Sequence, residues 1–438
     1  MRPANTRALA LRLLTEWESG DQFINLVLEK EEVALLSVAD KRFLTVLLYG
    51  TVERMLTLDY YISVLANRPA KDLSPHTRRL LRLGLYQLCF MQGVPDHAAV
   101  SETVALAGSR SERGFVNAIL RAAQRAPEKC RPPLRSENLV RHLSVAYSFP
   151  KDTVRHFLSA YGETLCEQIL SAFYEAQPLT LRVNTCRTSR EALLQRLLDA
   201  GHTADCTPYS PVGIRMAHSV DPTMLPGFAE GDFFVQDEAS QIATYALGAT
   251  PGATVVDTCA CPGGKSFGAA MDMNDQGSLY AFDLHESKLP LIKKGAGRLG
   301  LSCITAEAHN GENPKNELYQ KADFVICDAP CSGLGVLGKK ADLRYRGEER
   351  LQSLPPLQRK ILDAAATYVR PGGVLLYATC TINRAENEDV REDFLNTHAD
   401  FSAEPFAVGA LSAPEGYCQL LPPVHHTDGF FIAKFRRK

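Results

Sequence analysis

Two cysteines in the C-terminal half of the chain lie in short polar turns, where a thiol is available for chemistry. Cys331 belongs to the turn DAPCSG at residues 328–333, and Cys380 belongs to ATCT at residues 378–381. Each turn follows an apolar run of strand type. Cys331 and Cys380 are therefore candidate nucleophiles. Most cysteines are inert buried residues, and we expect this of Cys89, Cys166, Cys303 and Cys327.

A third polar turn, DTCACPGGKS at residues 257–266, has the composition of a ligand-binding loop. Gly263 and Gly264 allow a tight turn and a close backbone approach before a helix N-terminus. The turn ends like a phosphate-binding P-loop, but that motif needs glycine where Cys259 stands, and no GxGxxG fingerprint accompanies it. An acidic strand end with a Pro-Gly-Gly turn suits a ligand without a phosphate chain, such as S-adenosylmethionine.

Asp283 ends the next apolar run along the chain. A Rossmann-like fold places an acid near this point to accept hydrogen bonds from ribose hydroxyls. The alternative is an aspartate that only caps the following helix. The residue type and its position do not separate these two interpretations.

Six apolar segments have the length and composition of buried strands. They alternate with helical stretches, which indicates an α/β fold with a mostly parallel sheet covered on both faces. The expected strands are Thr254–Cys259, Ser278–Asp283, Cys303–Ala306, Asp323–Asp328, Gly373–Thr379 and Gly429–Phe435. Ligands bind beyond the carboxyl ends of such strands, and the polar turns described above fall at these ends.

The N-terminal part of the chain has the periodicity of helices separated by turns. Asn5 or Thr6 can cap a first helix. Further helices are expected at Lys41–Leu58, Pro75–Met91, Ala98–Ala107 and Gly114–Arg125. We predict an all-helical domain at residues 1–130, followed by a proline-containing linker at residues 126–136.

A small mixed unit is expected between this helical domain and the α/β domain. Helical patterns at residues 151–173 and 190–200 flank a short strand at residues 180–184. We therefore predict a small α/β subdomain at residues 141–231 and the large α/β domain at residues 235–438.

Charge is distributed unevenly along a chain of net charge −2. Residues 1–150 hold 20 Lys/Arg against 15 Asp/Glu, which leaves 28 against 35 for the remainder. A mildly basic N-terminal part fits a polyanionic partner. An excess of five charges is also ordinary for a solvated surface.

Several classes of protein are disfavoured by the composition. No stretch approaches the ~18 apolar residues of a membrane span, and the N-terminus lacks a secretion signal pattern. The twelve cysteines are scattered and form no pair of CxxC knuckles, which argues against a disulfide framework and a structural zinc site. We expect a cytoplasmic protein with reduced thiols, no metal and no membrane partner.

The motifs DTCACPGGKS, DAPCSG and ATCT, in this order, resemble the set that marks the RsmB/Sun (Fmu) family of bacterial 16S rRNA cytosine-C5 methyltransferases. VQDEASQ at residues 235–241, RVN at 182–184 and TDGFF at 427–431 are similar to further family segments. DKRFLTVLLYGTVER, LRLGLYQLCF and GFVNAILR in the N-terminal part resemble the NusB-type helical domain fused to the ribosomal members. The resemblance covers nearly the whole chain.

The resemblance implies a Rossmann-like S-adenosylmethionine-dependent methyltransferase domain, preceded by a NusB-like all-α domain and a small α/β RNA-binding subdomain. It implies 16S rRNA as substrate and 5-methylcytosine as product, and we expect a monomer. It assigns the nucleophile to Cys380, stabilisation of ring charge at N3 to Asp328, and assistance of product release to Cys331. The cofactor-binding residues would be Cys259, Ala260, Cys261, Pro262, Gly263, Gly264, Lys265, Asp283 and Asp328.

The chemistry behind these roles is covalent catalysis. Carbon 5 of cytosine gains nucleophilicity when a thiolate adds at carbon 6, and the thiolate requires a pKa below the ~8.5 of a free cysteine. Lys265 and helix N-termini are candidate causes of such a shift, and the alternative for Lys265 is a loop lysine in water. The target base must be unstacked. The helical domain, the subdomain of Arg182 and the basic run Lys339–Arg344 are expected to contact RNA phosphates, and the alternative for the basic run is a solvated loop.

The chain departs from the family pattern after the third strand of the α/β domain. Where relatives have an acid that contacts adenine, this chain has Ala308-His309-Asn310. Either His309 or Asn310 can still form a hydrogen bond there, and reduced cofactor affinity would follow if neither does.

Three other functions remain open from the sequence. A methyltransferase acting on tRNA would share every motif, because fold does not fix substrate. A non-catalytic RNA-binding or assembly factor draws support only from the departure at residues 308–310. A P-loop nucleotide hydrolase is disfavoured by Cys259 at the required glycine.

Overall fold

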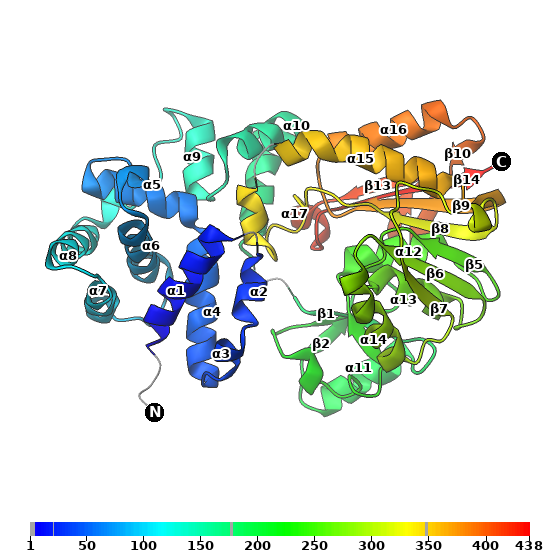
Figure 1. Ribbon diagram of the computed structural model, residues 1–438, viewed down its shortest axis with the longest axis horizontal. Helices are drawn as coiled ribbons and strands as arrows, with labels where there is room; N and C mark the ends of the chain where they lie inside the picture. Colours follow the sequence, from blue (N-terminus) through cyan, green and yellow to red (C-terminus); the bar gives the residue numbers. More distant parts are fainter. Residues whose placement is uncertain (1–4, 21, 176–177, 347–348) are drawn as a thin grey trace. The chain divides into compact units, whose positions relative to one another are not determined.

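The computed structural model describes residues 5–20, 22–175, 178–346 and 349–438 (Figure 1). Packing divides the chain into two compact units. Unit 1 comprises Met1–Tyr174 and Leu337–Arg346, and unit 2 comprises Glu175–Val336 and Gly347–Lys438. Residues 1–4 of the predicted helical domain and 176–177 of the predicted subdomain lie outside the described residues. The predicted three-domain boundaries stay a prediction.

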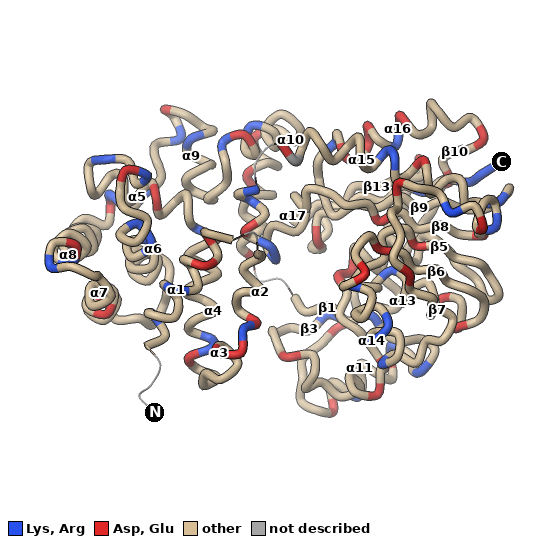
Figure 2. Tube along the Cα trace, in the orientation of Figure 1, with Lys and Arg blue, Asp and Glu red and all other residues tan. Residues whose placement is uncertain are grey.

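Unit 1 consists of helices, and the first eight of them surround one apolar core. They are α1 (Thr6–Ser19), α2 (Ile24–Leu28), α3 (Glu31–Ala34), α4 (Val38–Glu53), α5 (Met55–Ala66), α6 (Pro75–Phe90), α7 (Asp96–Ala105), α8 (Arg110–Arg125), α9 (Leu139–Ala146) and α10 (Lys151–Ala172). The Asn5 side chain caps α1 by accepting a hydrogen bond from the Ala8 amide, as predicted. Figure 2 shows basic and acidic residues interspersed along these helices.

The single helix predicted over residues 41–58 is wrong. The chain leaves the helical conformation at Arg54, with φ −102° and ψ 16°, so that α4 ends and α5 begins. The first turn of α5 is instead capped from a distance, because the Ser148 hydroxyl accepts hydrogen bonds from the amides of Leu56 and Thr57 at 3.0 and 3.5 Å. A cap supplied by a residue far along the chain leaves no local sequence pattern.

The 3₁₀ turn η6 (Ala341–Tyr345) belongs to unit 1 although it follows the DAPCSG turn in sequence. The Arg344 side chain is fully buried and donates to the Glu53 carbonyl at 3.1 Å and the Tyr174 hydroxyl at 2.5 Å. The expectation that Arg344 contacts phosphate is therefore wrong, because its guanidinium already serves the core of unit 1. Lys339 and Lys340 of the same run are exposed.

Unit 2 begins with a four-stranded antiparallel sheet in the order β2-β3-β1-β4. The strands are β1 (Thr180–Val183), β2 (Ala204–Cys206), β3 (Gly213–Met216) and β4 (Phe233–Val235), and α11 (Arg190–Asp199) packs against them. Arg182 lies on β1, is 1% exposed and donates to Asp272 at 2.9 Å. Arg182 is therefore not one of the groups through which this subdomain could contact phosphate, because it joins the small sheet to helix α13 (Gly264–Asp272).

The large sheet of unit 2 has the order β10-β14-β9-β8-β5-β6-β7, with β13 paired to β14. Its strands are β5 (Thr254–Asp257), β6 (Ser278–Asp283), β7 (Ile304–Ala308), β8 (Ala322–Asp328), β9 (Val369–Thr379), β10 (Phe401–Ala403), β13 (Tyr417–Leu420) and β14 (Phe430–Arg437). Strands β5 to β9 are parallel, and β14 runs antiparallel to β9. The mostly parallel α/β sheet is confirmed.

Helices cover both faces of this sheet (Figure 1). α12 (Glu238–Leu247), α13 (Gly264–Asp272) and α14 (Leu289–Leu299) share one apolar core with Leu376 and Ala378 of β9. α15 (Glu349–Ala366) and α16 (Glu388–Thr397) share the other core with Leu375 and Tyr377. This alternation along β9 is the pleat of a strand buried on both sides. The short strands β11 (Phe406–Val408) and β12 (Leu411–Ala413) and the helix α17 (Pro422–His425) complete the unit.

Among the described residues, no helix is long and apolar enough to cross a membrane. The same residues contain no group of three or more His, Cys, Asp or Glu side chains that could hold a metal ion.

Candidate active site

The predicted site residues come together at the carboxyl edge of the large sheet. Strand pairing places Asp257 beside Ile326, and Asp328 beside Ala378. The amide of Ala329 donates to the Ala378 carbonyl at 3.1 Å, so the turns after β8 and β9 start side by side. Because parallel strands end at one edge, turns far apart in sequence share one site in unit 2.

The two candidate nucleophiles are in contact. The Sγ atoms of Cys331 and Cys380 lie 3.2 Å apart. The hydrogen bond with Cys380, together with burial, raises the pKa of the Cys331 thiol well above its usual value. Cys331 therefore stays protonated and can donate its S–H to the sulfur of Cys380. A donor beside Cys380 favours the thiolate form of Cys380.

Lys265 forms an ion pair with Asp328, and its predicted effect on the pKa of the nucleophile stays a prediction. Its Nζ donates to Asp328 Oδ2 at 2.6 Å, and the lysine side chain is 8% exposed. The same ammonium lies 5.0 Å from the ring centre of Phe430. The alternative of a solvated loop lysine is wrong, since Lys265 is buried in the first turn of α13. The pair holds the Asp328 carboxylate in place while its Oδ1 has no partner among the described residues.

Asp257 is the last residue of β5 and is fully buried. The Ser266 hydroxyl donates to Asp257 Oδ2 at 2.6 Å. Burial raises the pKa of Asp257 to about 7, with a further contribution from the neighbouring charge of Asp328. The strand-end acid that the sequence predicts is therefore a group that loses its proton near neutral pH.

This raised pKa predicts a pH-dependent difference in stability for Asp257→Asn. Between the ordinary pKa of 3.8 and about 7, the unfolded state has lost the proton that the folded state keeps. The free energy of unfolding of the wild type therefore falls with rising pH through this window, by up to ~1.4 kcal/mol per pH unit from this group. The variant does not titrate, so its stability relative to wild type should rise from pH 4 to pH 7 in denaturant unfolding.

The control for this experiment is Asp205→Asn on β2, an exposed aspartate far from the site in sequence and outside its contacts. Its stability difference from wild type should stay flat over the same pH range. A flat difference for Asp257→Asn as well would contradict the raised pKa.

The turn at residues 259–264 fits a ligand that approaches the backbone closely. Gly263 has φ +112°, and a Cβ there would lie 2.3 Å from the Phe267 ring, so only glycine suits this position. The amide of Ala260 is held by the Phe282 carbonyl at 2.7 Å. Burial raises the pKa values of Cys259 and Cys261, and both therefore remain apolar thiols. An apolar wall beside a glycine turn suits the methionine part of S-adenosylmethionine.

Asp283 lies where the ribose-binding acid was predicted. Its Oδ1 accepts the His285 amide at 3.0 Å, and its Oδ2 has no partner among the described residues. The carboxylate therefore caps the turn after β6 and keeps one oxygen for a ligand, so the two interpretations from the sequence are compatible.

The segment that departs from the family pattern follows β7 directly. The His309 side chain already has partners within the protein. Its ring centre lies 5.1 Å from that of Phe282, and its Nε2 lies 2.6 Å from the Asn313 carbonyl oxygen. Asn310 uses its Oδ1 to accept the Glu312 amide at 3.0 Å. The Nδ2 group of Asn310 has no partner in the described part of the chain, so it can donate a hydrogen bond to a ligand at this strand end.

Two groups of the site were missed by sequence reasoning. Gly335 fastens the loop after Cys331, since its amide donates to the Cys380 carbonyl at 3.0 Å and its own carbonyl accepts the Gly429 amide at 2.8 Å. Glu386 lies fully buried beneath both cysteine turns. In the sequence it stands in RAENEDV, a charged run typical of a solvated helix start, so no local signal marked it.

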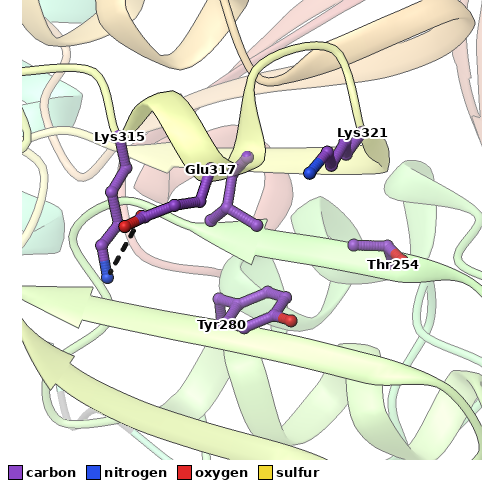
Figure 3. A pocket seen from close by; sticks show the side chains of 6 residues that line it. Thr254, Tyr280, Lys315, Glu317 and Lys321 are labelled. Atoms are coloured by element: carbon purple, nitrogen blue, oxygen red, sulfur yellow. Dashed lines mark ion pairs between the residues drawn. The ribbon is translucent and has the colours of Figure 1, made fainter.

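A pocket of about 250 Å³ lies at a different place on the same sheet (Figure 3). Thr254 opens β5 and Lys321 precedes β8, so the pocket faces the amino ends of these strands. Lys315 pairs there with Glu317 at 4.0 Å and with Glu307 at 2.6 Å. The predicted site residues do not line this pocket, which separates it from the cysteine site.

Fold and site together define a Rossmann-like methyltransferase domain with a ferredoxin-like subdomain and a NusB-type helical domain. The model of the family described as 16S rRNA methyltransferase RsmB/F matches residues 244–436. The NusB family model matches residues 4–125, and the RsmF/B-like ferredoxin-like domain model matches residues 149–223. The chain belongs to the 16S rRNA methyltransferase RsmB/F family.

Relatives and solved structures agree with this assignment over the whole chain. A protein of Synechocystis sp. named probable ribosomal RNA small subunit methyltransferase B is 37% identical and covers 99% of both chains. The Bacillus subtilis protein of the same name is 35% identical over 100% of both. The crystal structure of the protein PH0851 matches with a TM-score of 0.80 at 25% identity, covering 100% of this chain and 99% of that one. A methyltransferase homolog protein from Pyrococcus horikoshii matches with a TM-score of 0.60 at 29% identity, covering 68% of this chain and 98% of that one.

Proposed function

We propose that this enzyme transfers a methyl group from S-adenosylmethionine to carbon 5 of a cytosine in 16S rRNA, through a covalent bond between Cys380 and carbon 6. The observation that carries the proposal is the contact between the Cys331 and Cys380 sulfurs at 3.2 Å, at strand ends that also hold the Lys265–Asp328 pair. Covalent addition at carbon 6 needs one thiolate and one group that manages the protons of the ring. This site offers both.

Each residue of the constellation has a separate task in this proposal. The Cys380 thiolate adds to carbon 6, which makes carbon 5 an enamine carbon able to accept a methyl group. Asp328, held by Lys265, hydrogen-bonds N3 and stabilises the charge that develops in the ring. Cys331 takes the proton from carbon 5 when the Cys380–carbon bond breaks.

The cofactor would be held by the turn at residues 259–264 and by Asp283. S-adenosylmethionine supplies an electrophilic methyl group on a sulfonium. The free oxygen of Asp283 would accept the ribose hydroxyls, and the Asn310 amide would donate to the adenine in place of the missing acid. Cys259 and Cys261 would pack beside the methionine part.

The test is methyl transfer from tritiated S-adenosylmethionine to unmodified 16S rRNA, with nucleoside analysis of the product. Label in 5-methylcytosine of 16S rRNA, with unmodified tRNA inert, is the expected result. Label in tRNA alone would reassign the substrate. Cofactor binding without label in either RNA, including small-subunit assembly intermediates, would overturn the proposal in favour of a non-catalytic RNA-binding factor.

A further inference from the structure

Glu386 stands out among the groups that the proposed mechanism does not use. It lies in the 3₁₀ turn η7 (Arg384–Glu386), after the ATCT turn, and its exposure is 0%. Among the described residues, the groups that bond to its carboxylate are all donors and come from three segments of unit 2. A carboxylate accepts hydrogen bonds only, so this environment fits a single buried acceptor group that joins those segments.

The first set of bonds fastens the turn that carries Cys331. Ser332 donates its amide to Glu386 Oε2 at 2.8 Å and its hydroxyl to Oε1 at 2.5 Å. Gln358 donates to the same Oε2 at 3.0 Å and to the Pro330 carbonyl at 2.9 Å. Both neighbours of Cys331 in the sequence are thus fixed, directly or through Gln358, by one carboxylate.

The second set of bonds fastens the turn that carries Cys380. Thr381 lies 3.4 Å from Glu386 Oε1, and its hydroxyl is 2.8 Å from that of Ser332. The side-chain amide of Asn383 donates to Glu386 Oε1 at 2.9 Å, and its backbone amide donates to Thr381 Oγ1 at 3.3 Å. The residue after each cysteine therefore touches the same carboxylate.

We infer that Glu386 is a positioning residue that holds the Cys331 and Cys380 turns at the separation at which their sulfurs touch. The role of Glu386 in catalysis rests on the proposed function, whereas its role in holding the two turns together does not. No part of the Glu386 side chain reaches the solvent, so it acts on the thiols only through Ser332, Thr381 and their neighbours. Small displacements of reacting groups are costly: about 1 Å can lower a rate on the order of 100-fold.

The test uses Glu386→Gln, which keeps the shape of the side chain but turns one acceptor into a donor. With its nitrogen at the Oε2 position, the new amide would place an N–H donor against the backbone N–H of Ser332. That backbone group is also a donor and cannot reorient. The matched control is Glu388→Gln, which removes a carboxylate two residues away that forms no hydrogen bond with either cysteine turn in the described part of the chain. Ser332→Ala serves as the second variant, since it removes the hydroxyl that bonds to Glu386 and Thr381 and keeps the Ser332 amide bond.

The first readout is the rate at which Cys331 and Cys380 form a disulfide with diamide, measured by peptide mass spectrometry. In this reaction the two thiols lose two electrons and two protons to the diazene, which becomes a hydrazine, so the rate reports how often the sulfurs meet. We expect Glu386→Gln to slow cross-linking by at least 10-fold, Ser332→Ala by a smaller factor, and Glu388→Gln not at all.

The second readout is methyl transfer. Glu386→Gln should lower kcat by about 10- to 100-fold while the KM for S-adenosylmethionine changes by less than about 2-fold. Wild-type cross-linking rates in both Glu386→Gln and Ser332→Ala, or an equal loss in Glu388→Gln, would overturn the inference. Absence of methyl transfer by the wild type would contradict the proposed function, whereas the cross-linking rates would still test whether Glu386 positions the two turns.

Discussion

Replacing Cys380 with alanine is expected to lower methyl transfer to 16S rRNA by at least about 10⁴-fold, because removing a nucleophile removes the whole covalent route. Binding of S-adenosylmethionine should remain within a few-fold of wild type, since the residues proposed to hold the cofactor lie in the turns after β5 and β7 and at the end of β6, whereas Cys380 follows β9. The measurement is single-turnover transfer from tritiated cofactor with excess enzyme, together with calorimetric cofactor binding.

The matched control for this variant is Cys303→Ala, which removes a thiol of the same unit outside the strand-end turns of the site. Its transfer rate should stay within about 2-fold of wild type. Residual transfer by Cys380→Ala above a hundredth of the wild-type rate would show that another group attacks carbon 6, and Cys331 would then be the first residue to test in its place.

The juxtaposition of the site turns could be predicted because it depends on topology alone. Short apolar strands that alternate with helices put every strand-end turn at one edge of the sheet, so Cys331 and Cys380 had to be neighbours. Their contact at 3.2 Å depends on strand register and on the hydrogen bonds of Glu386. Its bonds to Gln358 and Ser332 join residues 28 and 54 positions apart, and no local pattern encodes these two.

Buried charges were the systematic failure of sequence reasoning. Arg182 lies in the subdomain and Arg344 in the basic run that were expected to contact RNA phosphates, yet each lies in a core with partners far along the chain. The burial of Lys265 could not be predicted for the same reason, since its partner Asp328 is 63 positions away. The short strands β10 to β13 were missed because three or four residues carry too little periodicity to distinguish a strand from a turn.

Cys331→Ala should bind RNA covalently and fail to release it. While Cys380 is a thiolate, the hydrogen bond to it is the larger of the two main causes that raise the pKa of Cys331. After Cys380 is bonded to carbon 6 its sulfur carries no charge, so the Cys331 thiol becomes easier to deprotonate at the step that needs a base. Alanine removes this base, and a general base contributes about 10²- to 10⁴-fold to such a step.

The expected signature is a protein–RNA adduct that survives denaturing electrophoresis and carries one methyl group per enzyme. Multiple-turnover transfer should fall by about 10²- to 10⁴-fold, whereas the first methyl transfer stays within about 10-fold of wild type. Cys418→Ala on β13 should form no stable adduct, and the double variant lacking both Cys331 and Cys380 should form none either. An adduct in that double variant, or free RNA product at the wild-type rate from Cys331→Ala, would exclude Cys331 as the group that accepts the proton from carbon 5. Cys331 donates a hydrogen bond to Cys380 before the addition to carbon 6 and accepts the carbon 5 proton afterwards. The contact between the two sulfurs then accounts for both the addition step and the release step.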